Sequence, residues 1–273
     1  MHPTVTKSIH STSKCPYHIF LSWMDKLFHP FKTHSSAHTS SGAAARCPVL
    51  NPSLRKAQQE VSSNTRPPSP AEILLSKTRD QIYHWPSPFS GFTSTINYSG
   101  PEGTFTNQVK IIPGQKNCCG FSNRVVAQWV DYQISEIIAH RSNTAGAHAI
   151  NQGPLSLGDE DTLWGQRINF VNDPMESFYR IKDLKLTQIG RSYPTQKFLV
   201  SIFEQHSFLG LNCARHYNVT YWDRSSGALS KVETFQDEYH EIQGIWIPRS
   251  RLYCLSADSS SSRLIDFSNT SLL

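Results

Sequence analysis

The first 59 residues of the chain have almost no acidic side chains. Asp25 is the single carboxylate in this stretch, which carries seven Lys and Arg residues and is rich in Ser, Thr and His. Such a composition is typical of organelle transit peptides and unlike that of a packed domain. We therefore predict a disordered transit peptide over residues 1–59, a polar linker over 60–68 and a single folded domain over 69–273.

The rest of the chain has little net charge. Subtracting the seven basic and one acidic residue of the leader from totals of 26 and 21 leaves 19 basic and 20 acidic residues. Nucleic acids and anionic membranes are bound by clustered Lys and Arg side chains. Because residues 60–273 are nearly neutral, we expect no nucleic-acid partner.

Long hydrophobic runs are also missing. A transmembrane helix needs about 20 consecutive apolar residues, and the nearest candidate, residues 19–31, is interrupted by Asp25, Lys26, His29 and Pro30. The same interruptions spoil a secretory signal. We therefore expect a soluble protein without a transmembrane segment.

Motifs that bind metals or carry out catalysis do not occur. The sequence has no GxSxG elbow, Walker loop, Rossmann glycine pattern, HExxH or CxxC. Histidines do lie near acidic residues, but their spacing fits no familiar ligand set. We therefore assign no catalytic residue, no metal and no cofactor, and we favour solvated or singly hydrogen-bonded roles for His140, His206, His216 and His240.

Two cysteines stand next to each other, at Cys118 and Cys119. An adjacent pair can form a strained disulfide or a redox site. Two ordinary thiols in a loop are the favoured interpretation, since no CxxC spacing accompanies them. Whether the pair is redox-active stays open at this point.

Two segments have helical patterns. Ser69, Pro70 and Glu72 match a capping box with proline at the first helical position, which predicts a helix over residues 69–84. Apolar residues recur at helical spacing over residues 123–141, with a face wide enough to require a covering partner. The natural partner is a sheet formed by the neighbouring sequence.

The remaining patterns are those of strands. Alternation with a period of two predicts a hairpin from residues 92–98 and 105–111, and a mobile loop follows near 142–160. Successive extended runs without intervening helices then predict an antiparallel meander. These runs occupy 163–170, 177–181, 184–190, 197–208, 212–222, 229–240, 245–255 and 263–267, with a Ser-rich linker at 256–262.

The predicted fold class is therefore α+β. A strongly curved antiparallel meander sheet, half-open or closed like a barrel, carries two helices, one of which covers the concave face. Such a lipocalin-like arrangement can enclose a cavity, and the body is rich in aromatic residues that could line it. Packing of a filled core uses the same residues and is the favoured alternative.

Two arginines near the C-terminus are the polar feature of most interest. Alternation would place Arg249 and Arg251 on one face, where they could hold a carboxylate or phosphate, although covering apolar neighbours at an open rim is the favoured alternative. The complete set of ligand-binding candidates is Trp129, Trp164, Tyr217, Tyr239, Trp246, Arg249 and Arg251.

Several short motifs resemble an uncharacterised family of cyanobacteria and plastids, a domain of unknown function. They are the stretches 71–74, 83–85, 89–92, 138–141, 216–217, 235–239 and 244–251, so that the resemblance covers about 69–253. The resemblance implies a photosynthetic lineage and therefore a plastid rather than a mitochondrial address. It implies no reaction. The stroma is favoured over the lumen because no second signal-like run follows the leader.

The preferred hypothesis is a chloroplast protein without enzymatic activity. It would bind an apolar molecule, namely a pigment, lipid or isoprenoid, or a partner in photosynthetic assembly. The alternative is an enzyme acting on a small anionic or isoprenoid substrate in the same cavity. That alternative requires Arg249, Arg251, His216 and Glu233 to converge.

Overall fold

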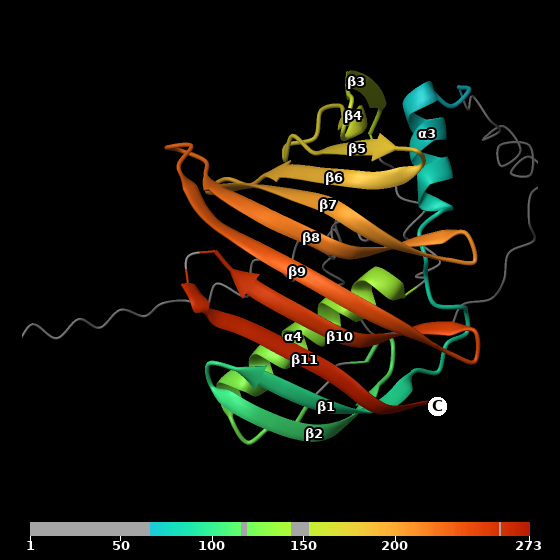
Figure 1. Cartoon of the computed structure of the whole chain (residues 1–273). Helices are drawn as coiled ribbons and strands as arrows, with labels where there is room; N and C mark the ends of the chain where they lie inside the picture. The colour runs from blue at the N-terminus through green and yellow to red at the C-terminus, as the bar shows by residue number, and fades with distance from the viewer. Residues whose placement is uncertain (1–65, 116–118, 143–152, 257) are drawn as a thin grey trace, which may run out of the picture.

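A computed structural model describes residues 66–115, 119–142, 153–256 and 258–273 (Figure 1). In these parts of the chain it contains two helices, α3 (Pro70–Arg79) and α4 (Arg124–Arg141), and eleven strands. The predicted transit peptide lies outside the described residues and stays a prediction. Neither of the two helices is long and apolar enough to cross a membrane.

Helix α3 begins where the sequence predicts. The backbone N–H of Glu72 donates to Ser69 Oγ at 3.3 Å, and the N–H of Ser69 donates to Glu72 Oε2 at 2.6 Å, which completes the capping box. The helix ends at Arg79, five residues before the predicted end. The cause is tertiary: the Tyr83 N–H donates to the carbonyl of Asn212 at 2.8 Å, so the chain leaves the helix to pair with the sheet.

Helix α4 also begins as predicted. The Asn123 side chain accepts from the N–H groups of Val125 and Val126, at 2.9 and 3.3 Å. The helix lies against one face of the sheet (Figure 1), and its Trp129 ring meets Tyr98 and Tyr253 edge-on at centroid distances of 5.8 and 5.7 Å.

All eleven strands belong to one antiparallel sheet with the order β2-β1-β11-β10-β9-β8-β7-β6-β5-β4-β3. The predicted meander is confirmed, and the hairpin β1–β2 is added beside the last strand. Because β2 and β3 are unpaired edges, the sheet is open, and the closed-barrel alternative is wrong. The strands are β1 (Phe92–Gly100), β2 (Gly103–Ile111), β3 (Leu155–Asp161), β4 (Gly165–Phe170), β5 (Phe178–Lys182), β6 (Lys185–Ser192), β7 (Gln196–Phe208), β8 (Leu211–Asp223), β9 (Leu229–Ile242), β10 (Ile245–Leu255) and β11 (Asp258–Leu272).

Two strands lie where the sequence predicts irregular structure. Strand β3 occupies the end of the predicted mobile loop near 142–160, of which 143–152 lie outside the described residues. Most of its side chains are exposed, so it has no hydrophobic alternation to reveal it. Strand β11 replaces most of the predicted linker at 256–262: Asp258 pairs with Leu255 of β10, and after an irregular stretch the pairing resumes between Arg263 and Tyr253.

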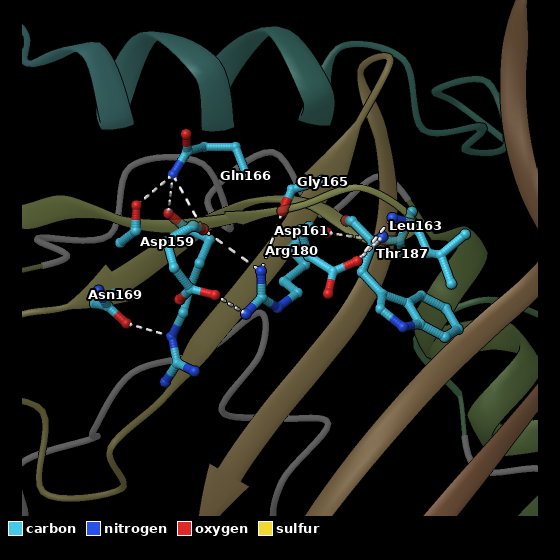
Figure 2. Close-up of polar contacts among 11 residues, drawn as sticks. Asp159, Asp161, Leu163, Gly165, Gln166, Asn169, Arg180 and Thr187 are labelled. Carbon is cyan, nitrogen blue, oxygen red and sulfur yellow. Dashed lines mark hydrogen bonds and ion pairs between the residues drawn. The ribbon is translucent and has the colours of Figure 1, made fainter.

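Polar contacts fix the turn between β3 and β4 (Figure 2). The Asp161 carboxylate accepts from the backbone N–H groups of Leu163 and Trp164 at 2.7 and 2.8 Å. Arg180 of β5 forms an ion pair with Asp159 at 2.5 Å and donates to the Gly165 carbonyl at 3.1 Å. These contacts stabilise β3 at the edge of the sheet without burying apolar surface.

Candidate ligand cavity between the helices and the sheet

A cavity of about 180 Å³ lies between the two helices and the sheet. Its walls are α3, the segment 81–84, the C-terminal half of α4 and strands β5 to β10. Exposed Lys185 and half-buried Arg79 line it, so the cavity reaches solvent between α3 and the start of β6. Most of the lining is apolar and includes Leu75, Leu186, Ile189, Val200, Ile202 and Val219.

Arg251 of β10 lines the cavity and is only 2% exposed. Its Nε and Nη2 donate to the two carboxylate oxygens of Asp237 at 2.7 and 2.6 Å, and Nη1 donates to Gln133 Oε1 at 3.1 Å. Burial works against the charge on Arg251, but the neighbouring Asp237 raises the pKa of the Arg251 guanidinium well above its ordinary value. The guanidinium therefore stays charged, and each of its three nitrogen atoms donates a hydrogen bond.

A second buried guanidinium, that of Arg141, lies at the end of α4 and is 6% exposed. Its Nη2 donates to the Tyr239 hydroxyl at 2.8 Å, and its guanidinium lies 5.1 Å from the centroid of the same ring. Nε is buried and has no hydrogen-bond partner within the described parts of the chain. No described carboxylate forms an ion pair with Arg141.

Glu136 of α4 lines the cavity and is 4% exposed. Burial raises the pKa of its carboxyl group to about 8, and the nearby charge of Arg251 opposes that rise only in part. Tyr132, one turn earlier on the same helix, lies within reach of the carboxyl group and also opposes the rise in part. At neutral pH this side chain is therefore mostly a neutral acid.

Only two of the seven predicted ligand-binding residues line this cavity, Tyr217 and Arg251. The hydroxyl of Tyr217 accepts from Arg251 Nη2 at 3.2 Å. Tyr239 does not line the cavity but holds Arg141, as described above, and Trp246 stacks on Tyr239 with ring centroids 5.8 Å apart. These four residues form a connected group at one end of the cavity.

The other three predicted residues lie elsewhere. Trp129 is buried in the aromatic cluster under the first half of α4, and Trp164 packs on Phe203 at the turn between β3 and β4. Arg249 is exposed and does not share a face with Arg251. The pairing of β10 with β9 shifts register between Pro248 and Ser250, which leaves Arg249 as the extra residue of a bulge and breaks the predicted alternation.

The residues required by the enzyme hypothesis do not converge. Arg251 lies on the side of the sheet that faces α4. His216 contacts Phe203 and points away from that side, because its neighbour Tyr217 faces the cavity. With Arg249 exposed at the bulge, this set of side chains cannot act on one substrate. Within the described residues, no group of three or more His, Cys, Asp or Glu could hold a metal ion.

Sequence reasoning missed the polar residues of α4. Gln133, Glu136 and His140 follow Trp129 at spacings of four, three and four, so they share one stripe of the helix, and all three line the cavity. Apolar residues flank this stripe on the same helix. A polar stripe beside an apolar one is the signal that would have indicated buried polar groups here.

The described domain coincides with a known sequence family. A family model described as "Protein of unknown function (DUF3386)" matches residues 67–273, so the chain belongs to that family. No curated protein sequence matches it.

Two crystal structures show distant similarity to the chain. One is an outer membrane lipoprotein-sorting protein domain from Vibrio parahaemolyticus, with 9% identity, a TM-score of 0.26, and coverage of 73% of this chain and 91% of that one. The other is a LolA superfamily protein from Nitrosomonas europaea, with 9% identity, a TM-score of 0.23, and coverage of 74% and 93%. Likeness at this level supports no conclusion about the ligand of this chain.

Proposed function

We propose that this member of the DUF3386 family binds an apolar small molecule in the cavity between α3, α4 and the sheet. One observation carries the proposal: about 180 Å³ of mostly aliphatic space stays open inside a domain whose other half is filled. Protein interiors rarely contain voids larger than a water molecule. An unfilled apolar cavity of this kind therefore favours a ligand over a filled scaffold that only binds protein partners.

The size of the cavity limits what it can hold. An apolar cavity of about 150 Å³ accommodates benzene, whereas sites for drug-sized ligands measure about 300–1,000 Å³. We propose that it takes a short molecule or the end of a longer lipid, isoprenoid or pigment. In this arrangement the sheet bends around α4 as a half-open cup, α4 covers the concave face, and α3 lies at the mouth.

Titration of octanol into the full-length chain tests the binding proposal. Octanol should bind saturably to the wild type and at least about tenfold more weakly to Val200→Phe, whose larger side chain would occupy the cavity. Val125→Phe is the matched control, because Val125 is 58% exposed on α4 and does not line the cavity. Absence of saturable binding, or equal loss in both variants, would contradict the proposal.

We further propose that residues 1–59 direct the protein to the chloroplast, most simply to the stroma, where its ligand or partner would belong to photosynthesis. The support is the composition of this leader, with seven basic residues and one acidic residue. A fluorescent protein fused to residues 1–68 should enter isolated chloroplasts and be shortened there. The same reporter fused to residues 69–273 should stay outside, and import of both or neither would reject this address.

A further inference from the structure

We infer that the ligand of this cavity carries one negative charge on an apolar body, most simply a carboxylate, and that Arg141 receives that charge. The inference rests on the proposed function and adds the chemical class of the ligand. It is carried by the polar groups that line an otherwise mostly apolar cavity.

Arg141 is the buried cation of the cavity that forms no ion pair with any described residue. Arg251 is fully engaged by Asp237, whereas Arg141 donates to the neutral Tyr239 hydroxyl and, at a long 3.5 Å, to the His140 carbonyl, with the Cys213 thiol and the already paired Asp237 nearby. Burying a charge is costly unless it is paired. The unpartnered Nε of Arg141 therefore fits an anionic oxygen, because charge-assisted hydrogen bonds are the strongest available here.

The charges around the cavity also favour an anionic ligand. Its lining contains four basic side chains against two acidic ones. Asp237 already neutralises Arg251, and Glu136 is mostly protonated at neutral pH because it is buried. A cationic ligand would add to an excess of positive charge, and a neutral one would leave Arg141 unpaired. A monoanion reduces that excess and pairs Arg141.

The route into the cavity agrees with this assignment. Arg79 and Lys185 line the opening between α3 and β6, where both are accessible to solvent. Basic side chains at an entrance raise the local concentration of anions. Glu136 lines the α4 wall, and as a neutral acid it can donate to a carboxylate without repelling it.

Octanoate and octanol separate this inference from the proposed function, since they differ only in the charged head. Titrated calorimetrically into the full-length chain at pH 7, octanoate should bind at least about tenfold more tightly than octanol. Arg141→Met should abolish that advantage, so that octanoate and octanol bind with similar affinity. Arg249→Met is the matched control: Arg249 is exposed and lies outside the cavity, so the advantage should persist.

A variant that preserves charge covers the case in which Arg141→Met fails to fold, as judged by circular dichroism. Arg141→Lys should keep part of the octanoate advantage, and it should lose more of it than Arg249→Met does. Octanol binding without any advantage for octanoate would overturn the inference and leave the proposed function standing. If neither probe binds the wild type, both are overturned. An advantage undiminished in the Arg141 variants overturns the role of Arg141.

Discussion

The two halves of α4 cover regions of opposite character. Beneath its first half, Trp129 packs edge-on against Tyr98 and Tyr253, and Phe235 meets Tyr253 in the same way at 5.4 Å. Beneath its second half lies the cavity, with the ionisable groups of Glu136, Arg141, Asp237 and Arg251 among apolar side chains. We call these regions the aromatic half and the cavity half.

The aromatic half contributes to the stability of the fold, and the cavity half to its proposed function. Dense aromatic packing stabilises a fold efficiently, whereas an open cavity and buried ions contribute little or cost free energy. The aromatic half is therefore sufficient to hold α4 on the sheet. The cavity half has features that packing alone does not explain, and a ligand explains them.

The largest effect should come from breaking the buried ion pair of the cavity half. Asp237→Ala leaves Arg251 charged and 2% exposed, so we expect a loss of about 3 to 5 kcal/mol in the free energy of unfolding. Glu176→Ala breaks an exposed pair with Arg224 and should cost less than about 1 kcal/mol. Urea unfolding of both variants measures the contrast, and equal losses would show that the buried pair has no special role.

Enlarging a valine in each half tests whether the aromatic half is fully packed and the cavity half is open. Val126 is fully buried against the α4 interface, and Val126→Phe should cost about 1 to 3 kcal/mol through overpacking. Val200→Phe makes the same change where the cavity can receive the ring, so its cost should be smaller. Thermal and urea unfolding would compare the two. If Val200→Phe costs as much as Val126→Phe, the cavity half is not open.

A smaller effect should appear in the dependence of stability on pH. The pKa of Glu136 is about 8 in the folded state against an ordinary value of 4.5, so the folded protein binds its proton more tightly. Its contribution to stability is complete below about pH 4.5 and is lost as the pH rises to about 8. Glu136→Gln removes the titration, and its melting temperature should therefore fall less between pH 5 and 9 than that of the wild type.

The surroundings of Glu136 determine how this result is interpreted. The ionisable groups that influence it or are influenced by it are Tyr132 on its own helix, Tyr217 and Tyr221 on β8, Glu233 on β9 and Arg251 on β10. All of them remain in Glu136→Gln, so the difference between the two melting profiles isolates one carboxyl group. Identical profiles would contradict its raised pKa.

The parts of the fold that could be predicted from the sequence are those that local chemistry determines. Ser69 and Asn123 cap the two helices by contacts within three residues, and period-two alternation predicts the hairpin β1–β2. Strand β3 and the Ser-rich start of β11 were missed because pairing with a neighbour, and not hydrophobic alternation, makes them strands. Local patterns contain no information about such pairing.

The candidate site was predicted only in part for similar reasons. Arg251 and Tyr217 were found because they stand in strands with clear alternation, while a bulge that no local pattern reveals turned Arg249 outward. Glu136 and Arg141 were missed because charged residues on a helix are usually solvated. Their burial depends on α3 and the sheet closing around them, which only the tertiary structure shows.

A crystal structure of the full-length chain with bromooctanoate, brominated at the end of its chain, tests the central claim most directly. Anomalous scattering locates the bromine and the electron density locates the carboxylate. We predict bromine among Leu186, Ile189 and Val200, with a carboxylate oxygen within hydrogen-bond distance of Arg141 Nε. A cavity filled by rearranged side chains, or a ligand bound only elsewhere on the molecule, would contradict the claim.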